Sequence, residues 1–309
     1  MLSYQTSFGS AFLAESLSFL RQLPSQSVDL FLTSPPFPLV TQKDYGNVAE
    51  SEYLDWLSPF TEAAYQALKP SGSLVIDLGG VYQRGRPYRS LYPYRFLLRL
   101  CDVQGFRLAQ EFYWYNPSKL PAPVEWVNVR KIRVKDSVNT LWWLGKTDST
   151  YSDSREVLVP YSERMKELIK KGDSFLPKHP SGWEISSKMS QDRGGALPSS
   201  LLTIPNTTSR DPYLKECRKL GIPIHPARFP KALPEFFIKF LTKPGETVCD
   251  FFAGSNMTGF VAEGLQRRWI SIEQNKNYWL GSFLRFSSGK SPVQVEEEIQ
   301  KLKKDLVSS

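Results

Sequence analysis

The chain carries one tetrad whose residue types could do chemistry, Ser34-Pro35-Pro36-Phe37, shortly after the apolar run Val28–Leu32. Two consecutive prolines fix two φ angles, remove two N–H donors and favour an extended backbone at Ser34. The tetrad therefore presents a hydroxyl, a carbonyl without a competing N–H and an aromatic face. Two acceptors and a stacking surface suit the exocyclic amino group of a base rotated out of its duplex. Taken alone, such a tetrad is also the pattern of a stiff exit from a buried strand.

A second motif, Asp250–Gly259, lies far downstream. The segment Glu246–Asp250 is a short strand pattern, and the motif continues it into a glycine-containing loop and a helix. The next strand, Trp269–Ile272, ends at Glu273. An acidic residue roughly 20 residues after the loop is the arrangement of a nucleotide-binding α/β unit, with the acid placed for ribose hydroxyls. Asn256 stands where a dinucleotide site has the glycine that admits a pyrophosphate. The loop therefore favours S-adenosylmethionine, which has no phosphates, over NAD.

The order of the two motifs resembles that of the β-class amino-methyltransferases of restriction–modification systems, in which the catalytic tetrad precedes the cofactor motif. The resemblance covers nearly the whole chain. It includes Tyr45-Gly46-Asn47, Glu52-Tyr53, Asp77-Leu78-Gly79-Gly80, the segment 114–121, the segment 131–136 and the segment 225–230. The family implies that a serine-type tetrad acts on the N4 amino group of cytosine in duplex DNA. The resemblance further implies the palindrome CAGCTG as the recognised word.

The tetrad predicts how the target amino group is held. We expect Ser34 Oγ and the Pro35 carbonyl to accept its N–H groups, with Pro36 keeping the backbone rigid and Phe37 stacking on the flipped base. Asp77 ends the next predicted strand and is our candidate to receive the released proton or to polarise Ser34. The alternative for Asp77 is a structural carboxylate that caps the following glycine turn.

The expected cofactor site combines the glycine-containing loop with acids near strand ends. Glu15 stands where the resemblance places a residue at the methionine end of S-adenosylmethionine. The candidate cofactor-binding residues are Glu15, Asp250, Phe252, Gly254, Asn256, Thr258, Gly259 and Glu273.

Basic residues indicate a polyanionic partner. The net charge is +8, the pI is about 9.2, and two clusters at 84–95 and 130–135 stand among aromatic residues. We expect at least one cluster to contact DNA phosphates, with a solvated surface as the alternative. The candidate DNA-binding residues are Arg84, Arg86, Arg130, Lys131 and Arg133.

Composition excludes several other classes of protein. Three widely spaced cysteines, Cys101, Cys217 and Cys249, favour reduced thiols and a cytoplasmic protein. The chain has two histidines and no paired cysteines, so we expect no metal site, and zinc-dependent base deaminases are excluded. No apolar run or leader predicts a membrane span or a secretory signal.

Helix and strand patterns alternate along the chain, as in an α/β protein. Ser51 is a candidate cap for a helix to Leu68, and Lys69–Gly72 is a predicted turn. The predicted strands are 28–32, 74–78, 106–114, 138–144, 246–250 and 269–272. The predicted helices are 15–23, 51–68, 94–103, 162–171, 234–241, 259–264 and 293–306.

These elements predict a mostly parallel, Rossmann-like methyltransferase sheet, in which Ser34 and Gly254 face one crevice at the strand ends. We expect a catalytic part at 1–150, a target-recognition insertion at 151–220 and a cofactor-binding part with a C-terminal helix at 221–309. The protein should act as a monomer or weak dimer. The alternatives are an N6-adenine methyltransferase, an RNA methyltransferase, or an inactive DNA-binding protein with a methyltransferase fold.

Overall fold

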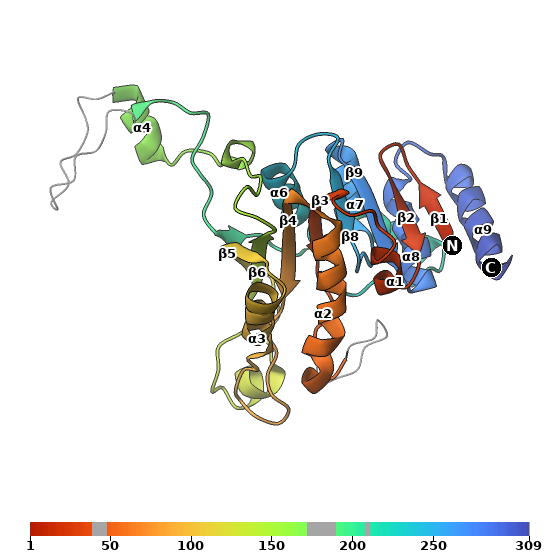
Figure 1. The fold of residues 1–309 in the computed structure, drawn as a ribbon, viewed down its shortest axis with the longest axis horizontal. Coiled ribbons are helices and arrows are strands. Elements are labelled where there is room, and N and C mark those ends of the chain that lie inside the picture. Colours follow the sequence, from red (N-terminus) through yellow and green to blue (C-terminus); the bar gives the residue numbers. More distant parts are fainter. Residues whose placement is uncertain (39–47, 172–189, 208–210, 309) are drawn as a thin grey trace. The chain divides into compact units, whose positions relative to one another are not determined.

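The computed structural model describes residues 1–38, 48–171, 190–207 and 211–308 (Figure 1). The chain divides into two compact units, one formed by Met1–Tyr151 with Ser200–Ser309 and the other by Ser152–Ser199. The insertion predicted at 151–220 overlaps the second unit, but its last residues belong to the first. Its role in target recognition stays a prediction. The segment Tyr45-Gly46-Asn47 lies outside the described residues.

The larger unit is built on one mixed sheet, with nine strands in the described residues and the order β1-β2-β9-β8-β3-β4-β6-β5-β7 (Figure 1). The five strands from β2 to β4 are parallel to one another, while β6 runs antiparallel to β4 and β5. The strands are β1 Leu2–Gln5, β2 Gly9–Leu13, β3 Val28–Thr33, β4 Leu68–Leu78, β5 Arg107–Tyr115, β6 Val138–Gly145, β7 Leu201–Thr203, β8 Thr247–Asp250 and β9 Arg268–Glu273. The predicted mostly parallel α/β fold is confirmed.

Helices cover both faces of this sheet, which is why every residue of β3 is buried. Phe31 belongs to a core cluster with residues of α1, α2 and α3, while its neighbours Leu30 and Leu32 point to the opposite face. The first layer is α1 (Ser16–Leu20), α2 (Glu50–Ala67) and α3 (Tyr92–Leu98). The second is α6 (Ala232–Leu241), α7 (Met257–Gly264) and α8 (Lys276–Ser282), with α5 (Pro212–Lys219) and α9 (Pro292–Ser308) packed against α8.

The smaller unit, Ser152–Ser199, has little regular structure in its described residues. It contains a 3-10 turn at Ser154–Val157 and the helix α4 (Glu163–Lys171). Val159 and Ala196 exchange backbone hydrogen bonds and join its two ends.

The predicted strands and helices are present, with two local corrections. Ser51 does not cap α2. The helix begins at Glu50, and the residue at its N-cap position, Ala49, makes no side-chain hydrogen bond. Acidic residues in the first turn stabilise this N-terminus by interacting with the helix dipole. Lys69–Gly72 is not a separate turn but part of β4, which pairs with β3 on both sides of a register shift. Strands β1, β2 and β7 and helices α5 and α8 were not predicted.

The parallel strands bring polar residues to one edge. Ser34 directly follows β3, Asp77 lies near the end of β4, and β8 and β9 end at Asp250 and Glu273. Antiparallel β6 starts at this edge, next to the end of β4. Ligands of open α/β sheets bind at the carboxyl ends of the strands, so this edge is where a site is expected.

Candidate active site

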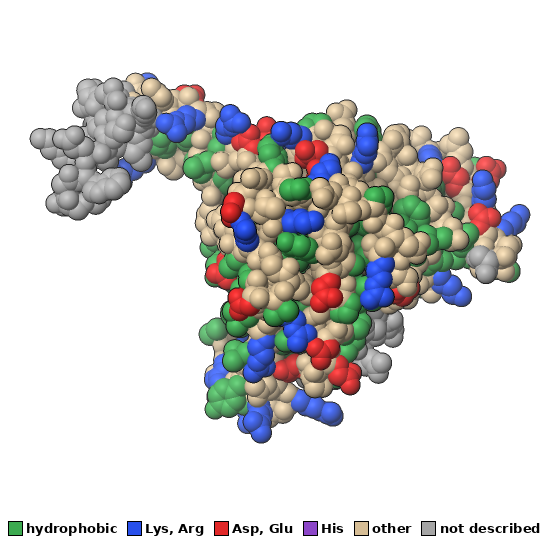
Figure 2. All heavy atoms as spheres, viewed as in Figure 1, with side chains coloured by type: hydrophobic (Ala, Val, Ile, Leu, Met, Phe, Trp, Pro, Cys, Tyr) green, Lys and Arg blue, Asp and Glu red, His purple; other side chains and the backbone are tan. Residues whose placement is uncertain are grey.

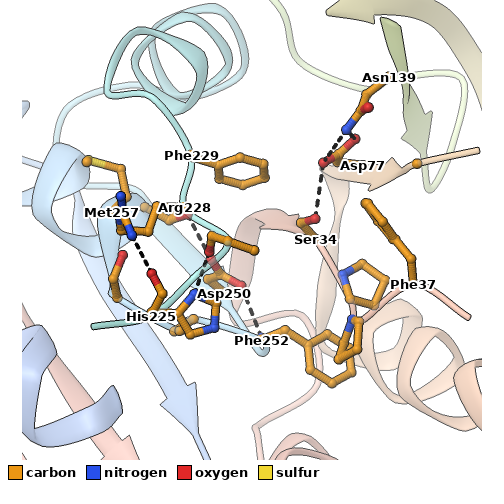
Figure 3. Close-up of a pocket in the computed structure, with 18 of the residues that line it drawn as sticks. Ser34, Phe37, Asp77, Asn139, His225, Arg228, Phe229, Asp250, Phe252 and Met257 are labelled. Atoms are coloured by element: carbon orange, nitrogen blue, oxygen red, sulfur yellow. Dashed lines mark hydrogen bonds between the residues drawn. The ribbon is translucent and has the colours of Figure 1, made fainter. Parts of the chain in front are cut away.

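A cavity of about 490 Å³ lies at this edge of the sheet (Figure 3). Its two sides come from distant parts of the sequence. The tetrad half consists of Ser34–Phe37, Asp77 and Asn139. The glycine-loop half is formed by Asp250, Phe252, Gly254, Thr258 and Glu273 and includes Met257 of α7. Ser34 and Gly254 thus line the same cavity.

The tetrad half is organised around the carboxylate of Asp77. Ser34 Oγ donates a hydrogen bond to Asp77 Oδ2 at 3.1 Å, and Asn139 Nδ2 donates to Oδ1 at 3.1 Å (Figure 3). Burial raises the pKa of Asp77 to about 6, although both hydrogen bonds oppose the rise. Within the described chain, the side chain of Asp77 bonds these two residues and not the following glycine turn, which disfavours the capping alternative.

Phe37 reaches the cavity because the backbone of Gly79 leaves room for its ring. A Cβ at position 79 would stand 2.4 Å from Phe37 Cε2, far inside contact distance. The ring is half-buried and also packs against the core cluster. Phe37 is therefore held on one side by the protein and lines the cavity on the other.

Asp250 holds the start of the glycine-containing loop in place. Its carboxylate accepts hydrogen bonds from Thr33 Oγ1 and Thr258 Oγ1, both at 2.8 Å, and from the N–H of Phe252 at 3.1 Å. Burial raises its pKa to about 6. The three partners tie the ends of β3 and β8 to the first turn of α7.

Glu273 fixes the next part of the loop. Its two oxygens accept the N–H of Gly254 at 2.8 Å and the N–H of Asn275 at 2.7 Å. Burial raises its pKa to about 7. Gly254 has φ +52°, and a Cβ there would approach His225 Nε2 to 2.9 Å, so both backbone conformation and space require glycine.

Three predicted cofactor-binding residues do not line the cavity. Asn256 lies beneath the loop at φ +54°, where its side chain accepts the N–H of Gly259 at 3.1 Å and Ser271 Oγ at 2.6 Å. Gly259 packs against that side chain. Glu15 caps α1 by accepting two backbone N–H groups, and although partial burial would raise its pKa, these bonds lower it.

Several lining residues were not predicted as site residues. His225 packs over Gly254, and burial lowers its pKa to about 4, so its ring is neutral at pH 7. Its Nδ1 lies 2.5 Å from the carbonyl of Ala227. Figure 3 shows His225 and Arg228 on the side of Met257, away from Asp77. The other unpredicted lining residues include Trp114, Asn116, Lys119, Asn139, Asn206 and Phe229. Four of these six residues, Trp114, Asn116, Lys119 and Phe229, lie in segments that carry the family resemblance, and that resemblance was the sequence signal that could have identified them.

The two basic clusters meet in space. Arg133 donates from Nε and Nη2 to the carbonyl of Pro87 at 3.1 and 2.8 Å, and Arg89 pairs with Asp136. The segments 84–89 and 130–136 therefore form one surface, with exposed Lys and Arg side chains at the lower end of the view in Figure 2. We call this surface the basic rim. The candidate residues Arg84, Arg86, Arg130, Lys131 and Arg133 are all exposed on it.

Within the described residues, no cluster of three or more His, Cys, Asp or Glu side chains could hold a metal ion. Nor does the described part of the chain contain a helix with the length and apolar character needed to cross a bilayer.

Comparison with known proteins defines the class. The DNA methylase family matches residues 28–282, which span both halves of the cavity. The chain belongs to this family, and the predicted membership is confirmed. Its relatives include the type II methyltransferase M.PvuII of Proteus hauseri, 51% identical over 286 residues that cover 92% of this chain and 85% of the relative.

More distant relatives and solved structures agree. The type II methyltransferase M.BglII of Bacillus subtilis is 25% identical over 264 residues, covering 85% of this chain and 65% of the relative. The structure of the PvuII DNA methyltransferase (cytosine-N4-specific) matches with a TM-score of 0.79 at 43% identity, over 99% of this chain and 94% of that one. The putative DNA modification methylase TTHA0409 of Thermus thermophilus shares the fold at 19% identity, with a TM-score of 0.57 and 90% and 94% coverage.

Proposed function

We propose that the protein transfers a methyl group from S-adenosylmethionine to the N4 amino group of a cytosine extruded from duplex DNA. The carrying observation is the Ser34–Asp77–Asn139 network, which shares one cavity with the loop held by Asp250 and Glu273. The cytosine-N4 specificity of the PvuII enzyme, whose structure matches nearly the whole chain, supports the choice of base.

The glycine-loop half fits a nucleoside cofactor without phosphates. Glu273 is a buried carboxylate at a strand end, and its oxygens keep lone pairs for ribose hydroxyls beyond the two N–H groups that they accept. Asn256 stands where a pyrophosphate-binding site has a glycine, and its side chain is hydrogen-bonded beneath the loop. When bound, S-adenosylmethionine supplies a methyl group on an already activated sulfonium. The roles assigned to Asp250, Phe252, Gly254, Thr258 and Glu273 in holding it are proposals.

The tetrad half would position the amino group and accept the proton that it releases. Because Ser34 donates its only hydroxyl hydrogen to Asp77, its lone pairs remain for an N–H of the amino group, and the Pro35 carbonyl takes the other. These acceptors stabilise the positive charge that develops on nitrogen as its bond to the methyl carbon forms. Asp77, with a pKa of about 6, is mostly ionised at neutral pH and accepts the proton that the nitrogen releases.

DNA would reach the cavity along the basic rim, where Lys and Arg side chains pair with phosphates. We propose CAGCTG as the recognised word, on the strength of the sequence resemblance. Methylation of that word would protect host DNA from a partner endonuclease in the cytoplasm. Monomer or weak dimer remains the predicted state.

The test uses methyl-labelled S-adenosylmethionine and two duplexes of equal composition, one with CAGCTG and one with the same bases scrambled. After digestion to nucleosides, we expect label in N4-methyl-2′-deoxycytidine from the first duplex, and much less of it with Ser34→Ala. Label only in N6-methyl-2′-deoxyadenosine would overturn the base assignment. Binding of cofactor and DNA without any transfer would instead indicate an inactive DNA-binding protein.

A further inference from the structure

Lys119 lies in the cavity wall beside the tetrad half and has no part in the proposed methyl transfer. Its backbone closes a turn by donating to the carbonyl of Asn116 at 3.2 Å. Its Nζ stands 3.5 Å from Asn139 Oδ1, and its positive charge opposes the rise in the pKa of Asp77. The ammonium group is therefore close to the network that would hold the amine.

Several polar groups on this wall are already hydrogen-bonded within the protein. The Asn116 side-chain oxygen accepts two backbone N–H groups, both at 3.1 Å. Asn206 and Trp114 each donate to a backbone carbonyl, at 3.0 and 2.8 Å, and the amide of Asn139 donates to Asp77. In the described chain no ion pair joins Lys119 to a carboxylate. An ammonium group has three N–H bonds, and the long contact with Asn139 uses at most one.

The bases that carry an exocyclic amino group differ in the groups next to it along the polar edge. In cytosine the amino group is followed by two acceptors, N3 and O2. In adenine it is followed by one acceptor, N1, and then by a C–H group. A donor placed at the far end of this edge is therefore satisfied by cytosine and left unpaired by adenine. Sites that hydrogen-bond a substrate group discriminate strongly against analogues that lack it.

We propose that the Lys119 ammonium donates a hydrogen bond to O2 of the target cytosine and thereby selects cytosine over adenine. This inference rests on the proposed function, because it assigns a partner to the base in the same cavity. Lys119 is then a residue that determines specificity by touching the substrate, whereas Ser34, Pro35 and Asp77 handle the amino group that both bases share.

The test compares kcat/KM on two duplexes that differ only in the target base, cytosine or adenine, each placed opposite an abasic site so that extrusion is similarly easy. Assays at pH 8, well above the Asp77 pKa of about 6, limit the effect of Asp77 protonation on the comparison. Lys119→Met should lower methylation of cytosine by about ten- to a hundredfold, as expected for the loss of a charged hydrogen bond, and leave adenine methylation unchanged. Lys119→Gln keeps a neutral donor, so its rate of cytosine methylation should lie between those of the wild-type protein and Lys119→Met.

Lys239→Met, on the outer surface of α6, is the matched control and should change neither rate. Cofactor affinity measured by calorimetry reports whether each variant is folded. An equal loss on both bases would overturn the proposal, because Lys119 would then act through Asp77 or through a phosphate. If the wild-type protein methylates adenine and not cytosine, or neither base, the proposed function fails instead.

Discussion

The two halves of the cavity hold their carboxylates in different ways. In the glycine-loop half, Asp250 and Glu273 bond backbone N–H groups and threonine hydroxyls that shape the loop itself. In the tetrad half, Asp77 bonds two side chains, Ser34 and Asn139, and both line the cavity. The glycine-loop half is thus a preformed binding site, while the tetrad half presents side chains that can exchange a proton. Changes in the two halves should therefore separate binding from turnover.

Loss of the proton acceptor should give the largest effect. Asp77→Asn keeps the shape of the side chain but cannot take a proton, so kcat should fall by about a hundred- to ten-thousandfold. Cofactor affinity, measured by calorimetry, should stay within about twofold. Asp29→Asn is the control, since Asp29 is a buried carboxylate paired with Lys69 outside the cavity. It should lower thermal stability and leave the turnover of the folded enzyme intact. A large loss of cofactor affinity in Asp77→Asn would contradict the assignment of cofactor binding to the glycine-loop half and turnover to the tetrad half.

Glu273→Gln should show the opposite pattern. The new amide NH₂ group would face an N–H group of Gly254 or Asn275, and the charged acceptor for ribose is lost. We expect cofactor affinity to fall by about 1.5–3 kcal/mol, with kcat at saturating cofactor nearly unchanged. Glu263→Gln is a matched control, because Glu263 also accepts hydrogen bonds but lies outside the cavity. Calorimetry and single-turnover rates together decide the outcome, and a fall in rate alone would contradict the assignment.

Phe37 tests whether the tetrad half holds an extruded base. An aromatic face contributes roughly 1–3 kcal/mol per stacked base, so Phe37→Ala should lose activity on paired DNA and lose less where the target cytosine is mismatched. Gly79→Ala should behave similarly, because the new methyl group would displace the ring. Methylation rates are measured on both substrates, and 2-aminopurine fluorescence at the target position reports extrusion of the base. Equal losses on the two substrates would mean that Phe37 only packs the core.

The two halves should also respond to different pH ranges. Asp77 accepts a proton only when ionised, so the single-turnover rate should fall about tenfold per pH unit as pH drops below the Asp77 pKa of about 6. Protonation of Glu273 removes its charge, so cofactor affinity should weaken as pH falls below about 7. Glu273→Gln should abolish the second dependence and keep the first. One shared pKa for both quantities would show that the halves titrate together.

The basic rim should give the smallest effect. Lys131→Ala should weaken DNA binding by a similar factor for all sequences and reduce the slope of log affinity against log salt by about one. Arg133→Ala should do more, because Arg133 also holds the carbonyl of Pro87 and thus joins the two segments of the rim. Salt titrations by fluorescence anisotropy measure both. Unchanged slopes would make the rim an ordinary solvated surface.

Local sequence predicted the parts of this site that depend on a few neighbouring residues. The apolar run before Ser34 forms the buried strand β3, and the pattern around Asp250 forms a strand, loop and helix. The two prolines of the tetrad fix their own backbone. Even the shared crevice of Ser34 and Gly254 could be expected, since parallel strands end at the same edge.

Other features depended on which segments lie side by side, and only the tertiary structure decided them. Asn139 reaches Asp77 because β6 runs antiparallel beside β4, a pairing that no local pattern encodes. Asn256 turns beneath the loop because its backbone is left-handed and Ser271 meets its side chain there. The two basic clusters become one rim through Arg133 and Pro87. The physical reason is the sequence distance over which each interaction acts. Turns and strand propensities depend on a few neighbouring residues, whereas strand order depends on burying the whole core at once.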